Sequence, residues 1–193
     1  MFDIPISVDV NGQSYNIRKK GDFRMVLDCF AALNDTELSK DERLLAALVI
    51  FYDGFEIEDI LNLDEDTLRA LVKEMYNFFN CGNSKGVGNK VNHNLIDWEQ
   101  DQQLICSAIN NVAKKEIRLE EYIHWWTFMG YYLAIGESPM STIVAIRHKI
   151  VEGKKLEKHE QEFRKENPQY FDWKSKSIEE QEANDAIMAM WNS

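Results

Sequence analysis

Apolar side chains recur at helical spacing along most of the chain, and they are densest between residues 122 and 135. A helix through this segment is apolar on most of its circumference, at Tyr122, Ile123, Trp125, Trp126, Phe128, Met129, Tyr131, Tyr132, Leu133 and Ile135. Such a helix has to be surrounded by other elements. It is too short for a membrane span and places His124 too near its middle. The pattern therefore predicts a central core helix, with a cofactor or sugar site built from the rings as the alternative.

The core prediction can be stated for individual residues. Trp98, on the neighbouring predicted helix, should be buried together with Trp125, Trp126, Phe128 and Met129. Emptying a large aromatic core site usually costs about 3–5 kcal/mol, and the sequence predicts a loss of this size for Trp126→Ala.

The first residues predict a β-hairpin. Asn11-Gly12 is a strong two-residue turn signal, because both central positions of the favoured turn need positive φ. Counting outward from the turn pairs Val10 with Gln13, Val8 with Tyr15, and Ile6 with Ile17. A hairpin alone is marginal in water, so this one must pack on the helices or join the sheet of another chain.

Capping residues divide the remainder into helices. Asp22 is a predicted N-cap, Ser39 and Glu42 form a predicted capping box, and Ser138-Pro139 starts a further helix that Gly153 closes. Between residues 53 and 66 the chain holds seven acidic residues and no basic one, which indicates a connector with at most one helical turn. The helical segments expected are about 23–30, 43–52, 68–79, 95–114, 118–135 and 139–152.

The polar pattern changes after residue 152. We predict a mainly α domain over residues 1–152 and a polar tether with an amphipathic C-terminal helix over residues 153–193. The helix ends in an apolar stripe that includes Ile187, Met190 and Trp191, which are candidates for partner binding. It is expected to pack on another copy or on a partner protein, unless it folds back over its own domain.

The net charge of −11 argues against nucleic acid as the main partner. Nucleic-acid binders need a basic face, so we expect no nucleic-acid partner. The sequence also shows no secretory signal pattern and no apolar run of membrane-spanning length. The scattered cysteines Cys29, Cys81 and Cys106 are typical of reduced thiols in a cytoplasm.

No residue pattern establishes a catalytic site. The glycine-rich stretch from Gly82 to Lys90 fails the P-loop spacing. Asp97 and Asp101 would share one face of the predicted helix, where they could serve acid–base or metal chemistry, or simply favour the start of a helix. With His124 they define one alternative, a small metal-dependent enzyme. We otherwise expect no enzyme activity, no metal and no cofactor.

Three motifs resemble a known family. They are Asp97-Trp-Glu-Gln-Asp101, His124-Trp-Trp-Thr-Phe128 and the apolar segment that ends at Arg147. Together with the hairpin and the Asn80-Cys81-Gly82 turn, they resemble the gene product fifteen family of tailed bacteriophages over residues 1–150. The chain departs from the family pattern between residues 111 and 117 and again after residue 152.

The resemblance implies a role in phage tail morphogenesis. Genes of this family usually lie just upstream of the tape-measure gene, the place of tail-assembly chaperones. The expected function is a non-enzymatic chaperone that binds the tape-measure protein and other tail proteins in the host cytoplasm. A second copy of the chain is a further candidate partner. The alternative is a virion component such as a connector or a tube-associated subunit. Within the motifs, Asp97, Asp101 and Arg147 are further candidates for partner contact.

Overall fold

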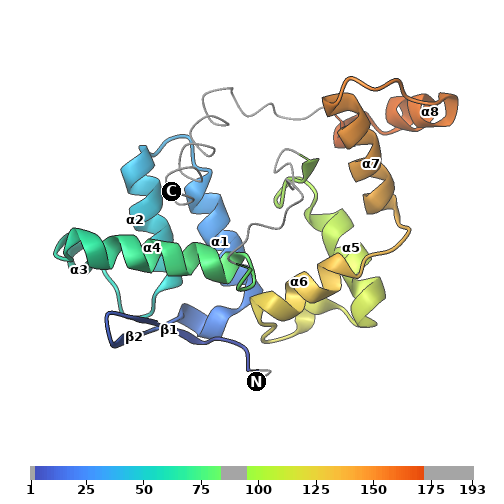
Figure 1. Ribbon diagram of the computed structural model, residues 1–193. Coiled ribbons are helices and arrows are strands. Elements are labelled where there is room, and N and C mark those ends of the chain that lie inside the picture. Colours follow the sequence, from blue (N-terminus) through green and yellow to red (C-terminus); the bar gives the residue numbers. More distant parts are fainter. Residues whose placement is uncertain (1–2, 84–94, 172–193) are drawn as a thin grey trace. The chain divides into compact units, whose positions relative to one another are not determined.

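The computed structural model describes residues 3–83 and 95–171 (Figure 1). The described chain divides into two compact units. Unit 1 comprises residues 3–83 and 122–127, and unit 2 comprises residues 95–121 and 128–171. The described residues form eight α-helices and one two-stranded antiparallel sheet, which confirms the predicted mainly α fold with an N-terminal hairpin.

The hairpin has the predicted register. Strand β1 (Ser7–Val10) pairs with β2 (Gln13–Asn16) so that Val10 faces Gln13 and Val8 faces Tyr15. Asn11 and Gly12 both have positive φ, 53° and 81°, as the two-residue turn requires. Beyond the strands, Ile17 donates its N–H to the Ile6 carbonyl over 2.8 Å and forms a bridge with Tyr52. The hairpin is thereby joined to the helical part of unit 1.

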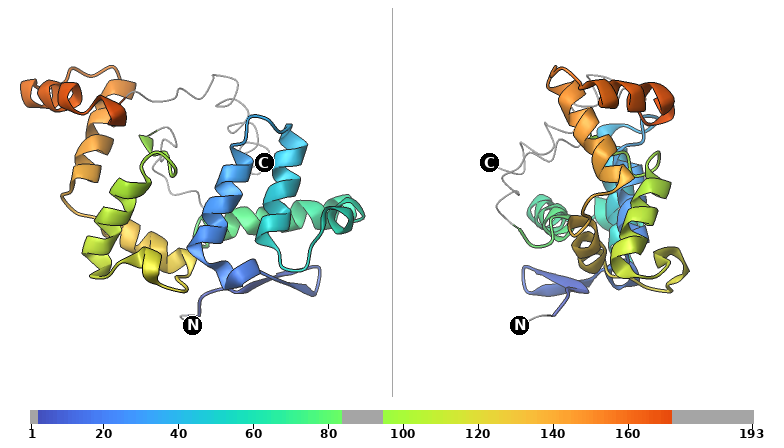
Figure 2. Two further views of the ribbon diagram at one scale, coloured as in Figure 1. Left: turned by 180° about the vertical axis from the view of Figure 1, so that it is seen from behind. Right: turned by 90° about the vertical axis from the view of Figure 1, so that its right-hand side faces the viewer.

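Unit 1 is built from four α-helices: α1 (Phe23–Leu33), α2 (Lys40–Phe51), α3 (Ile57–Leu61) and α4 (Glu65–Phe79), with a 3-10 turn at Arg18–Gly21. Helices α1 and α2 lie side by side, and α4 runs across them (Figures 1 and 2). The predicted caps are present: Asp22 accepts the Arg24 N–H, and Ser39 with Glu42 forms a complete capping box. Helix α4 starts earlier than predicted, because Asp64 caps it by accepting the Thr67 N–H.

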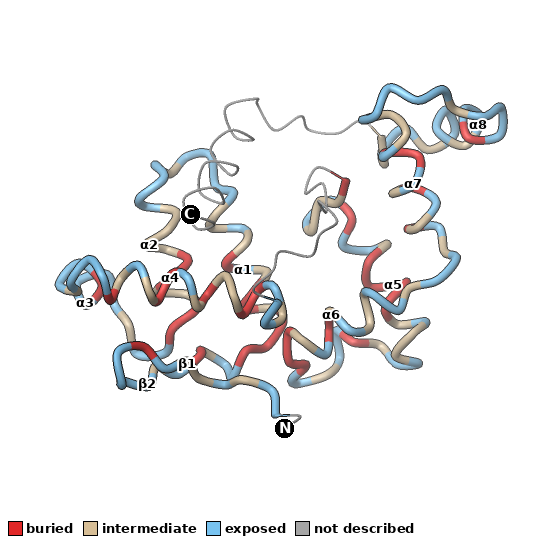
Figure 3. Tube along the Cα trace, viewed as in Figure 1, coloured by how far each residue is buried: buried red, intermediate tan, exposed pale blue. Residues whose placement is uncertain are grey.

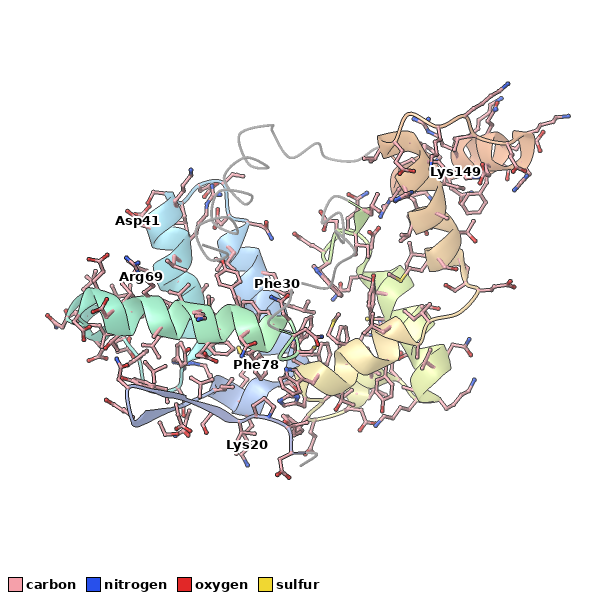
Figure 4. The ribbon with its side chains drawn as sticks, in the orientation of Figure 1. Lys20, Phe30, Asp41, Arg69, Phe78 and Lys149 are labelled. Carbon is pink, nitrogen blue, oxygen red and sulfur yellow. The ribbon has the colours of Figure 1, made fainter. Side chains whose placement is uncertain are left out.

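The core of unit 1 is an aromatic cluster. Phe51 contacts Phe78 and Phe79 edge-on, with ring centroids 5.3 and 5.6 Å apart. Phe30 meets Phe79 at 5.0 Å and Trp125 at 5.6 Å, again edge to face. Figure 4 marks Phe30 on α1 and Phe78 on α4. Edge-to-face pairs contribute beyond the area they bury, so the cluster orients the helices as well as excluding water.

Unit 2 contains α5 (Gln102–Ala113), a 3-10 turn (Ile117–Leu119), α7 (Pro139–Val151), α8 (Lys158–Glu166) and a 3-10 turn (Pro168–Tyr170). Helix α6 (Trp125–Leu133) begins in unit 1 and ends in unit 2. The predicted cap at Ser138 with Pro139 after it is present, Ser141 completing a capping box, and Gly153 follows α7 with a φ of +65°. The predicted starts of two helices were wrong, since α5 begins at Gln102 rather than near Leu95 and α6 at Trp125 rather than near Arg118.

The aromatic segment is shorter and less enclosed than predicted. Trp125 and Phe128 are each 1% exposed, but Trp98, Trp126 and Met129 are only half-buried, and Leu133 is 77% exposed. The prediction of deep burial was therefore wrong for these three side chains. The helix is shorter than predicted because the chain before it is held extended at residues 122–124. There the Ile123 carbonyl accepts the Phe23 N–H, and the Ile123 N–H donates to the Asp22 carboxylate.

The chain after residue 152 is not a free tether as far as it is described. Lys149 on α7 donates to the Glu160 carboxylate on α8 over 2.6 Å, and Glu160 is buried. Residues 128–171 belong to unit 2, and the predicted boundary at residue 152 stays a prediction. The predicted C-terminal stripe with Ile187, Met190 and Trp191, and most of the glycine-rich stretch, lie outside the described residues.

Candidate functional site

The first motif centres on a buried ion pair within unit 2. Arg147, on α7, donates two hydrogen bonds to the Asp101 carboxylate: Nη1 to Oδ2 over 2.5 Å and Nη2 to Oδ1 over 2.9 Å. Each side chain is only 3% exposed. Arginine suits this position because its planar guanidinium matches the two carboxylate oxygens and keeps its charge when buried.

The same guanidinium also binds two backbone carbonyls. Nη1 donates to Leu95 and Nε donates to Tyr170, each over 2.9 Å. One side chain thus connects the segment before α5, the start of α5, α7 and the turn after α8. A buried charge is tolerated only when its polar atoms are satisfied, and here the partners surround it.

The acidic motif forms a turn ahead of α5. Asp97 donates its backbone N–H to Asp101 Oδ2 over 3.0 Å. The Asp97 carboxylate in turn accepts the N–H groups of Glu99 and Gln100 over 2.9 and 2.8 Å. The two aspartates were predicted to share one face of a helix; the structure instead places Asp97 in the turn, with Asp101 at its end. Short acidic side chains compete with helical hydrogen bonds in this way.

Aromatic rings cover this turn. The Trp98 ring lies 5.5 Å from the Tyr132 ring and 6.2 Å from the Phe128 ring, between centroids. Burial, and next the Asp101 carboxylate, raise the pKa of Tyr132 to about 12. The phenol therefore stays protonated at neutral pH and adds no negative charge beside the ion pair.

The second motif closes the end of α4 in unit 1. Trp125 donates its indole N–H to the Phe79 carbonyl over 2.9 Å, and Trp126 donates to the Phe78 carbonyl over 3.0 Å. The last carbonyls of a helix lack partners within the helix, and the Trp125 indole supplies a donor to that of Phe79. The Phe78 carbonyl accepts both the Trp126 indole and the Cys81 N–H, the latter over 3.0 Å.

The Asn80-Cys81-Gly82 turn completes this arrangement. Cys81 and Gly82 both have positive φ, 55° and 75°, and the Gly82 N–H returns to the Asn77 carbonyl over 2.9 Å. A Cβ at residue 82 would lie 3.2 Å from the Trp126 ring, which is tighter than most such contacts. Glycine therefore both permits the backbone conformation and leaves room for the ring.

His124 is held between backbone groups. Its Nδ1 accepts the Trp126 N–H over 3.1 Å, and its Nε2 lies 3.0 Å from the Pro5 carbonyl. Because Nδ1 acts as an acceptor, the proton is on Nε2, which donates to Pro5. The ring is 2% exposed and packs edge-on against Phe78. This is a satisfied structural histidine that joins residue 5 to the start of α6.

The neutral state of His124 predicts a pH-dependent stability. Desolvation lowers the pKa of His124 from its ordinary value of 6.5, against the opposing effects of the Pro5 hydrogen bond and the Asp22 carboxylate. The unfolded chain then takes up the proton before the folded chain does. Stability contributed by this site is complete above the unfolded pKa and decreases as the pH falls through about 6.5.

Urea denaturation at about pH 7.5 and pH 5.5 measures this effect, since the ordinary histidine pKa lies between the two values. The wild type is expected to lose stability at the lower pH. In His124→Gln, which has no titrating ring, the part of the decrease due to this site should be absent. Equal pH dependence in the two proteins would contradict the assignment of a neutral, buried ring.

The side chains named in the metal-site alternative bind other groups of the chain. Both nitrogens of His124 are engaged with backbone groups, and both oxygens of Asp101 bind Arg147. Across residues 3–83 and 95–171 no three His, Cys, Asp or Glu side chains gather in a way that could hold a metal ion. Burial also raises the pKa of the Cys29 thiol, and that of Cys81 to about 11, so both thiols are protonated at neutral pH.

The family described as "Bacteriophage Gp15 protein" matches residues 1–171 of the 193-residue chain. The chain belongs to this family. No curated protein and no solved structure matches it.

The Gp15 match reaches further than the sequence motifs indicated. It was expected to end near residue 150, but it continues to residue 171 and so includes Tyr170, whose carbonyl binds Arg147. The sequence could not predict this contact, because every residue type carries a backbone carbonyl. The sequence predicted the Asp22 cap on the Arg24 N–H, but not the second bond, in which the same carboxylate accepts the Ile123 N–H.

The charged side chains proposed for partner contact in the Gp15 motifs are buried or half-buried. Asp101 and Arg147 were candidates for partner contact, but their side chains are buried against each other, and Asp97 is half-buried within its own turn. In this conformation neither Asp101 nor Arg147 presents its charge to another molecule. Among the described helices, none is both long enough and apolar enough to cross a membrane.

Proposed function

We propose that the chain is a non-enzymatic tail-assembly chaperone that binds the tape-measure protein in the host cytoplasm. The observation that carries the proposal is the match to the bacteriophage Gp15 family over residues 1–171, because that family indicates a phage structural or morphogenesis protein. Other tail proteins, or a second copy of the chain, are further partners under the same proposal.

The distribution of functional groups supports a binding role. The motif side chains that could have served catalysis are engaged in holding the fold: Asp101, Arg147 and His124 all have their polar atoms bonded within the chain. The acidic surface, with a net charge of −11, keeps the protein soluble and favours basic protein segments as partners. Long helical proteins such as tape measures are expected to be recognised through amphipathic helices.

Co-expression with the tape-measure protein encoded by the same phage tests the proposal. The soluble fraction of the tape measure is expected to rise, and the two proteins should co-purify through a tag on either one. An unrelated acidic helical protein of similar size, expressed at the same level, is the control for general effects on solubility. Unchanged solubility together with no co-purification would contradict the proposed function.

A further inference from the structure

Helix α3 presents two apolar side chains to the solvent. Ile57 and Leu61 are 54% and 66% exposed, and at i and i+4 they lie on the same face of the helix. Ile60, next to this pair on the helix surface, is only 1% exposed and anchors α3 in unit 1. Figures 1 and 3 show α3 beside the N-terminal end of α4 with most of its residues exposed. The apolar pair is therefore held in a fixed position.

The sequence on both sides of this pair is rich in exposed carboxylates. Residues 53–66 contain seven acidic side chains and no lysine or arginine, and all seven are exposed: Asp53, Glu56, Glu58, Asp59, Asp64, Glu65 and Asp66. Asp59 and Asp64 accept backbone N–H groups at the starts of α3 and α4, and Glu65 pairs with Arg69 over 2.7 Å. Within the described part of the chain, Asp53, Glu58 and Asp66 form no ion pair.

The exposed apolar pair and the acidic side chains together favour a partner helix that is both apolar on one face and basic. Two exposed aliphatic side chains at helical spacing can bury their surface against the apolar stripe of another helix. The acidic surroundings favour lysine and arginine beside that stripe and disfavour acidic peptides, nucleic acids and anionic membranes. A second copy of this chain, which carries a net charge of −11, would meet repulsion here.

We propose that Ile57 and Leu61 of α3, together with the acidic residues from Asp53 to Asp66, form a docking surface for a basic amphipathic helix of a partner protein. It goes beyond the proposed function, because it names the contact residues and the chemistry of the bound segment and holds whichever protein supplies that segment.

The test uses the full-length protein labelled with 15N and a synthetic amphipathic helix made of leucine and lysine. A scrambled peptide of the same composition, without an apolar stripe, is the peptide control. Amide signals of residues 55–63 are expected to shift on titration with the amphipathic peptide and to respond far less to the scrambled one. Binding should weaken as salt is raised, because exposed charges are screened over about 8 Å at physiological ionic strength.

Matched variants assign the binding to α3. Ile57→Ser/Leu61→Ser is expected to weaken binding about tenfold or more, as when central apolar contacts of an interface are lost. Leu119→Ser, which changes a side chain 83% exposed in unit 2, should bind as the wild type does. Both proteins should keep the wild-type Tm, because the replaced side chains are exposed.

Several results would overturn the inference: no binding of the amphipathic peptide, shifts confined to other residues, equal binding of the scrambled peptide, or wild-type affinity in the α3 double variant. Shifts of residues 55–63 that depend on protein concentration without peptide would instead assign the surface to self-association and overturn it as well. None of these results depends on the tape-measure protein. Failure of this test is therefore distinguishable from failure of the co-expression experiment.

Discussion

Replacing Arg147 by alanine is expected to lower the free energy of unfolding by about 3–5 kcal/mol, the usual cost of breaking a buried ion pair from one side. The substitution leaves the Asp101 carboxylate buried without its counter-charge and removes the donors to the Leu95 and Tyr170 carbonyls. Because folded domains are stable by only about 5–15 kcal/mol, the loss should also be visible as a large fall in Tm. Urea denaturation followed by circular dichroism measures it.

A double variant separates the cost of leaving the Asp101 charge unpaired from the cost of lost packing. Arg147→Met/Asp101→Leu removes both charges and keeps apolar volume, so it should be less destabilised than the sum of the two single variants. As a control, Arg69→Ala removes the partner of an exposed pair with Glu65 and should change stability by less than about 1 kcal/mol. A loss from Arg147→Ala as small as that of the control would show that the pair does not hold unit 2 together.

Trp125→Ala is expected to cost about 3–5 kcal/mol, because it empties a large aromatic site in the core. The ring is 1% exposed, meets Phe30 edge to face, and donates its N–H to the Phe79 carbonyl. Its removal leaves both a cavity and an unsatisfied carbonyl at the end of α4.

The adjacent Trp126 provides the matched comparison. Its indole makes the equivalent hydrogen bond, to the Phe78 carbonyl, but the side chain is only half-buried. Trp126→Ala should therefore cost about 1–2 kcal/mol, mainly for the hydrogen bond and part of the ring area. This revises the larger value predicted from the sequence pattern. Equal losses in the two variants, or a larger loss for Trp126, would contradict the assigned roles.

Local signals predicted the local structure well. The Asn11-Gly12 turn, the Asp22 cap and the Ser39–Glu42 capping box each depend on residues within a few positions of one another, and all appear where they were expected. The same holds for the helix that begins after Ser138. These features are decided by backbone conformations and hydrogen bonds that the neighbouring residue types specify.

Long-range contacts determine where α5 and α6 begin, which the apolar pattern could not predict. The helical periodicity around Tyr122 is genuine, yet residues 122–124 are extended because Asp22 and Phe23, about a hundred positions earlier, bind the backbone of Ile123. Helix α5 starts late for a related reason, since Asp101 turns its carboxylate to Arg147 and to the Asp97 N–H. The periodicity of apolar residues carries no information about such partners.

The candidate site was located from the sequence, but its role was not. Asp97, Asp101, His124 and Arg147 lie in the motifs on which the resemblance to the family was based, which made them candidates for partner contact or for chemistry. Their burial and their mutual bonds give them a structural role in this conformation. By contrast, the acidic stretch from Asp53 to Asp66 was interpreted only as a connector, because the exposure of Ile57 and Leu61 becomes visible only in the folded structure.

Quantitative mass spectrometry of purified phage particles, alongside cells sampled during assembly, tests most directly whether the chain acts in assembly or is built into the virion. As a chaperone, the protein should be abundant in the assembling cells, co-purify there with the tape measure, and be absent from washed particles. A fixed number of copies in every particle, in constant ratio to the known tail proteins, would contradict the chaperone assignment and identify a structural subunit.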